Sequence, residues 1–362
     1  MKLTNITTFI VGARPNFIKL APIAREFKKK KISFQIINTG QHRDYLVSKI
    51  FFDQFGISKF YNLNINSKSS NELISKTIIK LEKVFTKIKP PLVVVFGDVN
   101  STLAASIAAK NVNIKLAHIE SGLRSFDKKM PEEINRILTD HLSDFKFYTE
   151  SSAKINLKKE NIFNNCFFVG NIMIDNLIYF KPKALKKKTY LKYNLKKKNY
   201  IYVSLHRPEN VDNKEKLGKI LYNIDKLSKN FKVIFPVHHR TKRSINIFKL
   251  NRLMKNIINI EPQSYLDNLN LIINSKGVLT DSGGIQEETA FLNIPCAVLR
   301  KNTERPVTLK RSNAQLTNAS QVENSLKKLI LKKSKLKIKY WDGKTSKRIA
   351  DHLNVLRKKK LV

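Results

Sequence analysis

The segment Leu92–Ile119, LVVVFGDVNSTLAASIAAKNVNIKLAHI, decides the fold class. It opens with a continuous apolar run, Leu92–Phe96, which is typical of a strand buried on both faces. A helical stretch rich in small residues follows at Ser101–Ala109, and a second apolar run ends the segment at Lys115–Ile119. The order strand, helix, strand predicts a βαβ unit with parallel strands.

The same alternation continues on both sides of this segment. It predicts four further strands at Ile6–Val11, Ser33–Asn38, Phe145–Thr149 and Phe167–Val169, and helices at Phe17–Lys30, Asn71–Ile88 and Glu132–Leu142. A second series of strands is expected at Tyr200–Leu205, Lys232–Val237, Ile257–Ile260, Gly277–Leu279 and Cys296–Leu299. Between the series, Lys181–Lys198 contains no acidic residue, which indicates either a linker or a solvated helix face. We therefore predict an α/β protein of two Rossmann-like domains that face a cleft, with ligands at the carboxyl ends of the strands.

The composition limits the classes of protein. The 362 residues, 42% of them hydrophobic, are enough for two packed domains. The net charge of +41 is typical of a nucleic-acid or anionic-membrane binder, but it also fits a compositional bias towards Lys. The excess is spread along the chain together with many Asn and Ile residues, and no zinc-finger or RNA-recognition signature accompanies it. We favour the compositional interpretation and expect no specific nucleic-acid partner.

Targeting and redox signals are few. The sequence has no run of about 18 apolar residues, so it predicts no membrane span. The first residues are typical of a strand rather than a signal peptide. Cys166 and Cys296 are too few for a disulfide framework and lack metal-ligand spacing. We expect a reduced cytoplasmic protein without a metal.

The first corner between a predicted strand and a helix reads GARPNFIK, Gly12–Lys19. It has neither the Gly pattern of dinucleotide sites nor a Walker lysine, so neither hydride transfer nor P-loop chemistry is favoured. Arg14 and Lys19 suit an anion or a nucleobase, and equally a basic pair on the surface.

Two carboxylates, Asp98 and Glu120, stand at the ends of predicted strands. Asp98 suits a turn or helix cap as well as a site. Glu120 occupies a poorly solvated position, which favours a role in proton transfer.

The segment MPEEINRILTD, Met130–Asp140, predicts a helix that begins near Pro131. Glu132 and Arg136 are four residues apart and share a face. Spacing alone favours an exposed ion pair over a catalytic carboxylate that is positioned by an arginine, and it leaves both open.

The second half carries SLHRPEN after one strand and PVHHR after the next, with His206, Arg207 and His238. No partner spacing indicates a metal there. A third strand leads into TDSGGIQEE, Thr280–Glu288, which combines a glycine turn with a helix start. Bare amides at a helix N-terminus bind phosphates, and an acidic residue one turn later can accept from a ribose. This indicates a nucleotide site made by Ser282, Gly283, Gly284 and Glu288.

Together these segments resemble the non-hydrolysing UDP-N-acetylglucosamine 2-epimerases, which have a glycosyltransferase-B-like fold. The ordered matches run nearly end to end: GARPNFIKLAP, TGQH, GDVNSTLA, HIESGLRS, MPEEINRILTDHLSD, VGN, LHRPENVD, FPVHHRT, TDSGGIQEE, NTERPVT and the closing WDGKTSKRI. The resemblance implies a first domain at 1–172, a UDP-binding domain at 173–344, and a last helix at 345–362 that packs back on the first domain.

The resemblance also implies an activity without a cofactor: UDP-N-acetylglucosamine is inverted at C2 to UDP-N-acetylmannosamine, a precursor of surface polysaccharides. UDP leaves by anti elimination to 2-acetamidoglucal and returns by syn addition. The resemblance implies a homodimer as well. The catalytic positions match Asp98, Glu120, Glu132, His206 and Arg136, the UDP positions match Arg14, Lys19, Ser282, Gly283, Gly284 and Glu288, and an allosteric site matches Gln41, Arg207 and His238.

Some positions depart from the family. Asp44 replaces a Gln of the allosteric site, Ser67–Ser69 lacks its Arg, and Arg311–Ala314 replaces a Gly-containing turn. The same motifs also resemble epimerases of 2,3-diacetamido uronic acid nucleotides. The sequence further leaves open a hydrolysing 2-epimerase that releases N-acetylmannosamine and UDP, a glycosyltransferase of the same fold, and a basic nucleic-acid-binding protein.

Overall fold

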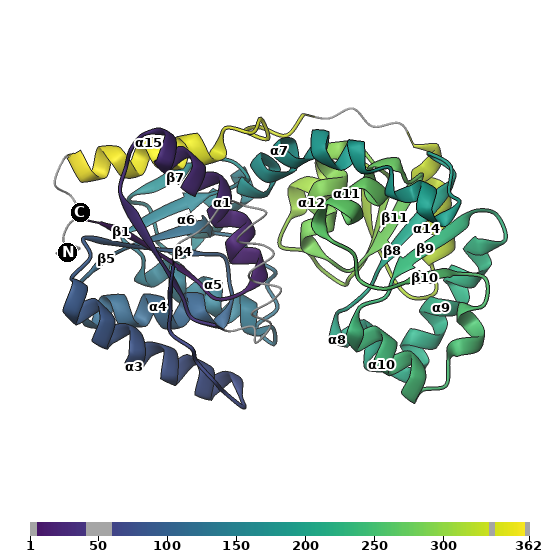
Figure 1. Ribbon diagram of the computed structural model, residues 1–362, viewed down its shortest axis with the longest axis horizontal. Coiled ribbons are helices and arrows are strands. Elements are labelled where there is room, and N and C mark those ends of the chain that lie inside the picture. Colours follow the sequence, from purple (N-terminus) through teal and green to yellow (C-terminus); the bar gives the residue numbers. More distant parts are fainter. Residues whose placement is uncertain (1–5, 41–59, 333–336, 359–362) are drawn as a thin grey trace. The chain divides into compact units, whose positions relative to one another are not determined.

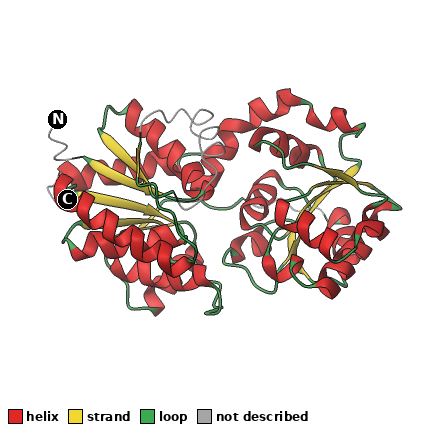
Figure 2. Ribbon diagram, turned by 60° about the horizontal axis from the view of Figure 1, so that its bottom comes forward, coloured by secondary structure: helices red, strands yellow, loops and turns green. Residues whose placement is uncertain are grey.

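The computed structural model describes residues 6–40, 60–332 and 337–358 (Figure 1). The chain forms two compact units, Met1–Asn176 with Lys339–Val362, and Leu177–Ile338. Each unit contains one parallel β-sheet with helices packed on it (Figure 2). The predicted α/β class with two Rossmann-like domains is confirmed.

The sheet of the first unit has the strand order β3-β2-β1-β4-β5-β6-β7. The chain begins in the middle of the sheet at β1 and moves outward to one edge, and then returns at β4 to build the other half. Such a reversal leaves a crevice beyond the carboxyl ends of the two central strands. The strands are β1 (Thr7–Val11), β2 (Phe34–Asn38), β3 (Tyr61–Asn62), β4 (Leu92–Phe96), β5 (Lys115–Ser121), β6 (Phe145–Tyr148) and β7 (Cys166–Phe168).

Helices cover both faces of this sheet (Figure 1). On one face α1 packs against α15, and on the other α4 packs between α3 and α5. The helices are α1 (Arg14–Lys29), α3 (Ser70–Ile88), α4 (Asn100–Asn111), α5 (Pro131–Leu142), α6 (Ser151–Lys159) and α15 (Thr345–Lys358). A further helix, α7 (Ile172–Lys187), begins in this unit and continues into the second.

The second unit repeats the architecture with the strand order β10-β9-β8-β11-β12-β13, which reverses between β8 and β11. The strands are β8 (Tyr200–Ser204), β9 (Lys232–Pro236), β10 (Ile258–Ile260), β11 (Gly277–Thr280), β12 (Cys296–Leu299) and β13 (Ala314–Thr317). The helices are α8 (Pro208–Val211), α9 (Lys214–Ser228), α10 (His239–Ile247), α11 (Tyr265–Asn274), α12 (Gly283–Leu292), α13 (Pro306–Arg311) and α14 (Val322–Leu331).

The departures from the predicted elements are local. The edge strands β3 and β13 were not predicted, because the first has two residues and the second alternates polar and apolar side chains. The Lys-rich stretch 181–198 is not a linker: it forms the end of α7 and a 3₁₀ turn at Thr189–Tyr193. The prediction of a solvated helix face is the correct one for its first part, where most of the lysines are exposed.

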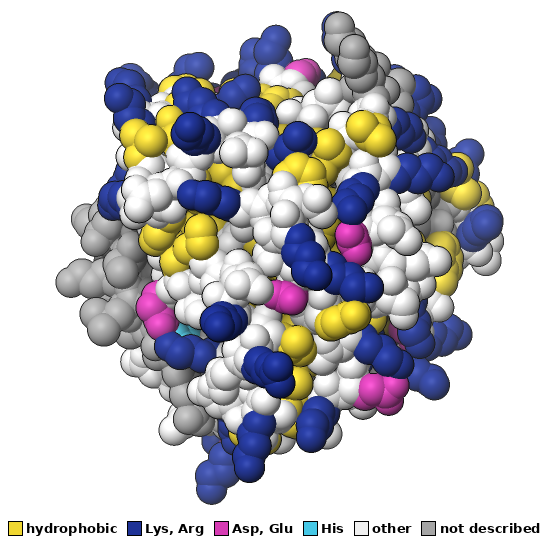
Figure 3. All heavy atoms as spheres, turned by 90° about the vertical axis from the view of Figure 1, so that its right-hand side faces the viewer, with side chains coloured by type: hydrophobic (Ala, Val, Ile, Leu, Met, Phe, Trp, Pro, Cys, Tyr) yellow, Lys and Arg dark blue, Asp and Glu magenta, His cyan; other side chains and the backbone are white. Residues whose placement is uncertain are grey.

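Among the described residues, no helix is long and apolar enough to cross a membrane. Lys and Arg side chains are scattered over the face seen in Figure 3, interrupted by apolar and neutral side chains. On this face they do not form the continuous stripe that tracks a nucleic-acid backbone.

Asp175 of α7 anchors the start of the last helix, α15. Its carboxylate accepts hydrogen bonds from the backbone N–H groups of Thr345 and Ser346, at 3.2 and 2.7 Å, and from Ser346 Oγ at 2.6 Å. All three residues are buried. Asp175 therefore caps α15 from a distant part of the chain.

We predict that Asp175→Ala lowers the free energy of unfolding by about 2 kcal/mol, because it leaves buried N–H groups of a helix start without an acceptor. Chemical denaturation measures this change. The matched control is Asp351→Ala on α15, which removes the exposed ion pair with Lys30 and should leave the transition nearly unchanged. Equal effects of the two substitutions would contradict the capping role.

Candidate active site

The corner between β1 and α1 is held by the side chain of Asn16. Its Oδ1 accepts from the N–H groups of Gly12 and Ala13, both at 3.1 Å, and its Nδ2 donates to the carbonyl oxygen of Phe96 at 3.0 Å. A β-carbon on Gly12 would lie only 2.2 Å from Ser101 Oγ, so glycine lets this corner approach α4. The corner after β1 is thus fixed to the corner after β4.

Lys19 of α1 forms a buried ion pair with Glu120 at the end of β5. Their side chains are 7% and 6% exposed. Gly97, with a φ of +60°, makes room for the ammonium group, since a β-carbon there would lie 2.6 Å from Lys19 Nζ. The structure thus brings together two residues that the sequence assigned to different tasks, UDP binding and catalysis. Arg14 is the first residue of α1, but its side chain lies outside the described structure.

The backbone at Glu120 adopts a conformation that disfavours most residues. Its φ is +75°, and the register between β5 and β6 shifts between Ile119 and Ser121. A left-handed residue other than glycine costs about 1–2 kcal/mol, and such strain is concentrated at functional sites. The next glycine, Gly122, has a φ of +76°, and a β-carbon on it would lie 2.5 Å from the Ala153 carbonyl oxygen. The strained turn directs the Glu120 carboxylate towards Lys19.

Arg136 of α5 holds a different carboxylate from the predicted one. Its Nη2 contacts Asp98 Oδ2 at 2.6 Å and its Nη1 contacts Glu133 Oε2 at 2.7 Å. The predicted ion pair between Glu132 and Arg136 is therefore wrong. Glu133 and Arg136 lie three residues apart on the buried face of α5, whereas Glu132 falls on its exposed side.

Glu133 is held by hydrogen bonds from the loop before α5. Its two oxygens accept from the N–H and hydroxyl groups of Ser125 and from the N–H group of Phe126, at 2.8 to 2.9 Å. Nearby, Asn135 donates to the Asp98 carbonyl oxygen at 2.8 Å. The sequence interpretation missed Asn16, Glu133 and Asn135. Each lies within a recognisable motif, but only tertiary contacts show that they fix the corners around Asp98 and Glu120.

In the second unit, His206 is positioned by Asp281 at the end of β11. His206 Nδ1 lies 3.0 Å from Asp281 Oδ1, and the aspartate side chain is fully buried while the histidine is 41% exposed. Asp281 also accepts from the N–H groups of His206 and Arg207 and from Asn210 Nδ2. Burial acts to raise the pKa of Asp281, but the interactions with His206 and the hydrogen bonds from Arg207 and Asn210 together lower that pKa. An ionised Asp281 places the His206 proton on Nδ1, which leaves Nε2 for a ligand.

Asp281 is a functional candidate that the sequence interpretation did not single out. The available signal was its place directly after β11, where the strand order reverses, next to the predicted diphosphate turn.

The predicted allosteric residues are only partly described. The rings of His206 and His238 lie 5.8 Å apart between centroids, and His238 Nδ1 accepts from the N–H group of Arg240 at the start of α10. Burial is the largest cause that lowers the pKa of His238, and electrostatic interactions with His206, His239 and Arg240 lower it further. Arg207 directly follows His206 in sequence, whereas Gln41 is outside the described residues.

The start of α12 has the glycine turn and helix N-terminus that the sequence predicted. Ser282 is the N-cap, and Gly283 and Gly284 are the first two helical residues. A β-carbon on Gly283 would approach Glu304 Oε1 to 3.1 Å. Glu288, predicted to contact a ribose, lies one turn further along and is buried.

A chain of buried ion pairs surrounds this helix start. Arg300 binds Glu304 at 2.6 Å, Glu304 binds Arg305 at 2.5 Å, and Arg305 binds Glu287 at 2.5 Å. Within the described part of the chain, Nε and Nη1 of Arg300 have no hydrogen-bond acceptor although they are buried. These N–H groups can donate to an anion at the α12 start.

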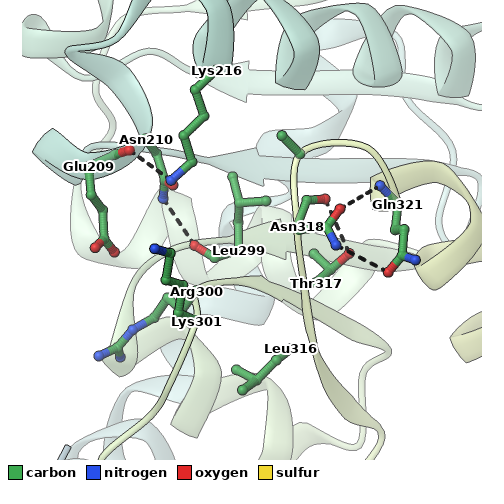
Figure 4. A pocket seen from close by; sticks show the side chains of 11 residues that line it. Glu209, Asn210, Lys216, Leu299, Arg300, Lys301, Leu316, Thr317, Asn318 and Gln321 are labelled. Carbon is green, nitrogen blue, oxygen red and sulfur yellow. Dashed lines mark hydrogen bonds between the residues drawn. The ribbon is translucent and has the colours of Figure 1, made fainter. Parts of the chain in front are cut away.

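A pocket of about 320 Å³ opens beside Arg300, beyond the ends of β12 and β13 (Figure 4). This volume is in the range of small-ligand sites. Leu299, Leu316 and Ala319 are the apolar residues of its lining, and Asn210 and Lys216 come from α8 and α9. The residues that line it are Glu209, Asn210, Lys216, Leu299, Arg300, Lys301, Leu316, Thr317, Asn318, Ala319 and Gln321. Among the residues that the structure describes, no group of three or more His, Cys, Asp or Glu side chains is arranged to hold a metal ion.

Comparisons with known proteins cover nearly the whole chain. The profile of the family described as UDP-N-acetylglucosamine 2-epimerase matches residues 25–354. A UDP-N-acetylglucosamine 2-epimerase homolog of Methanococcus maripaludis is 44% identical over 82% of this chain and 84% of its own. The UDP-2,3-diacetamido-2,3-dideoxy-D-glucuronate 2-epimerase of Pseudomonas aeruginosa is 36% identical over 95% and 98%.

A solved member of the family has the same fold over nearly the whole chain. The crystal structure of Methanocaldococcus jannaschii UDP-GlcNAc 2-epimerase in complex with UDP-GlcNAc and UDP superposes with a TM-score of 0.89 and 40% identity, covering 96% of this chain and 99% of that one. The predicted glycosyltransferase-B-like architecture is confirmed. On its sequence and its fold, the chain belongs to the UDP-N-acetylglucosamine 2-epimerase family.

Proposed function

We propose that the protein interconverts UDP-N-acetylglucosamine and UDP-N-acetylmannosamine by inversion at C2. The observation that carries the proposal is the pair of carboxylates at neighbouring strand ends, Asp98 held by Arg136 and Glu120 held by Lys19. Family membership and a relative solved with UDP-GlcNAc and UDP support the choice of substrate.

The chemistry requires elimination, because the C2 proton is not acidic in the sugar itself. A base takes the C2 proton while the C1–oxygen bond breaks and its electron pair leaves with UDP. The product is 2-acetamidoglucal, and UDP then adds back as a proton arrives on the opposite face of C2. No oxidant or metal is consumed, and the protons are exchanged by positioned carboxylates.

The residues divide between the two ends of the substrate. Asp98, Glu120 and Glu132 serve the sugar, and the exposed Glu132 is the one that can reach a ligand without breaking a buried contact. The leaving diphosphate needs donors that strengthen as charge develops on it. We assign this task to the α12 start with Ser282, Gly283 and Gly284, together with His206, Arg14 and Lys19, and assign the ribose to Glu288.

A second candidate substrate is a UDP-2,3-diacetamido sugar or uronate. The Pseudomonas aeruginosa relative with that name favours it. The homodimer implied by the family belongs to the same proposal, and a monomer in sedimentation at assay concentrations would contradict it.

We predict that the purified protein, incubated with UDP-N-acetylglucosamine in D2O without added metal or NAD, forms UDP-N-acetylmannosamine with deuterium at C2. Proton NMR and mass spectrometry measure both changes. Free N-acetylmannosamine would indicate the hydrolysing branch instead. Absence of exchange with this substrate, but exchange with the diacetamido uronate, would move the assignment to the second candidate.

We predict that Glu120→Gln and Glu132→Gln each lower kcat by about 100-fold or more while UDP binding changes little, because each removes a proton-transfer carboxylate. Glu133→Gln is the matched comparison on α5. It should lower the unfolding temperature, because Glu133 is hydrogen-bonded and buried, whereas Glu132→Gln should not. Near-normal turnover of Glu132→Gln would exclude Glu132 from the reaction.

We predict that Asp281→Asn lowers kcat by roughly 100-fold, because an amide does not fix the proton of His206 on Nδ1. UDP affinity measured by calorimetry should remain within about threefold of the original value, since the α12 start is intact. The control is Asp225→Asn, a half-buried position in the same unit that accepts from Asn256. A change in stability without a change in kcat would show that Asp281 is only structural.

A further inference from the structure

His118 and Asp140 form a completely buried pair that the proposed mechanism does not use. Both side chains are 0% exposed, and His118 Nδ1 lies 2.7 Å from Asp140 Oδ1. The other ring nitrogen, Nε2, lies 2.8 Å from the carbonyl oxygen of Gly97. Both ring nitrogens of a histidine on β5 therefore face oxygen atoms.

The hydrogen-bond inventory decides the protonation of the ring. A carbonyl oxygen can only accept, so the Gly97 contact requires a proton on Nε2. Asp140 Oδ2 already accepts from the Gly122 N–H group at 2.9 Å and from Arg124 at 2.8 Å. These two donors favour an ionised carboxylate, which in turn requires a proton on Nδ1. A neutral ring would place a bare nitrogen against an oxygen inside the protein, which is costly.

Among the charges around the pair, the Asp140 carboxylate stabilises a cationic ring, whereas the cations Arg124 and Lys146 oppose it. Asp140 comes from α5, Arg124 follows β5, and Lys146 on β6 is the register neighbour of His118. Burial acts to raise the pKa of Asp140, yet the charge of His118 and the donors around it lower that pKa. Arg124 is in turn bound by both oxygens of Glu160 after α6.

The pair touches both corners that carry the candidate carboxylates. Gly97 immediately precedes Asp98, and Gly122 follows Glu120 by two residues. Gly97, Glu120 and Gly122 all have positive φ values. A tether is needed at such positions, because the local backbone would otherwise relax.

We propose that His118 is a positioning residue whose ring carries a proton on both nitrogens, and that with Asp140 it fixes Gly97 and Gly122 and so aligns Asp98 and Glu120. The alignment of these carboxylates matters to catalysis only through the proposed epimerase function, on which the positioning role rests. The charge state of His118 does not depend on that function.

The first test reads the charge state directly. In protein with ¹⁵N-labelled histidine at about pH 8, above the ordinary titration range of histidine, one ring should show two N–H signals with imidazolium shifts. His118→Gln should remove that pair of signals, and His141→Gln on α5, whose ring is half exposed, should leave it. A His118 ring with a single N–H would overturn the proposal, whatever the activity.

The second test removes the two ring contacts of His118 one at a time. Asn at position 118 can place an amide donor near the Nδ1 position, towards Asp140, and Gln can place one near the Nε2 position, towards Gly97. We expect both variants to lose about 100-fold in kcat, because small misplacements of reacting groups are costly, with UDP affinity within about threefold. His141→Gln is again the control.

The outcomes are distinct. Variants that fold, bind UDP and keep a near-normal kcat would overturn the positioning role. Proportional losses of kcat and UDP affinity, together with a lower unfolding temperature, would also overturn it in favour of a merely structural role. If the parent protein does not exchange deuterium at C2, the proposed function fails instead, and the NMR result still decides the charge of His118. If the variants do not fold, the NMR result on the parent protein stands as the deciding measurement.

Discussion

Burying the ion pair between Lys19 and Glu120 is the constraint on which the first unit depends. Removing two charges from water costs several kcal/mol per ion unless geometry and further contacts compensate. The corners around the pair are accordingly specialised: Gly97 lacks the side chain that would displace the ammonium group, and the left-handed backbone of Glu120 directs the carboxylate inward. A pair of this kind is weak evidence for stability, and its cost is better explained by function.

The carboxylates of the first unit differ in environment, and the difference separates their roles. Glu133 is saturated with donors from the loop before α5 and from Arg136, so protonating it would break the corner. Glu132, the next residue towards the N-terminus, is exposed. Asp98 lies between these extremes, fixed by Arg136 but about a quarter exposed. Groups that must exchange protons with a substrate need access, and groups that shape the corner need burial.

Much of the fold followed from the sequence, because apolar runs such as Leu92–Phe96 have one interpretation when they alternate with helices. Most strand bounds agreed within one or two residues. The pairing of side chains did not follow from the sequence, because helical spacing offers several partners. Glu133 and Glu132 lie three and four residues before Arg136, and the folded structure pairs Arg136 with Glu133. Contacts between distant segments, such as His206 with Asp281, depend on which strands become neighbours in the sheet.

The second unit carries an energetic cost that a bound anion would remove. Two nitrogen atoms of Arg300, Nε and Nη1, are buried without an acceptor among the described residues, and each such unsatisfied donor atom costs about 1–3 kcal/mol. Arg300 lies beside Gly283, at the N-terminus of α12, where the first backbone N–H groups of a helix lack helical partners. An isolated helix start attracts anions only modestly. The charge of Arg300 is offset by Glu304, but its unused donors lie at the same point, so a diphosphate bound there would satisfy groups that the protein itself leaves unsatisfied.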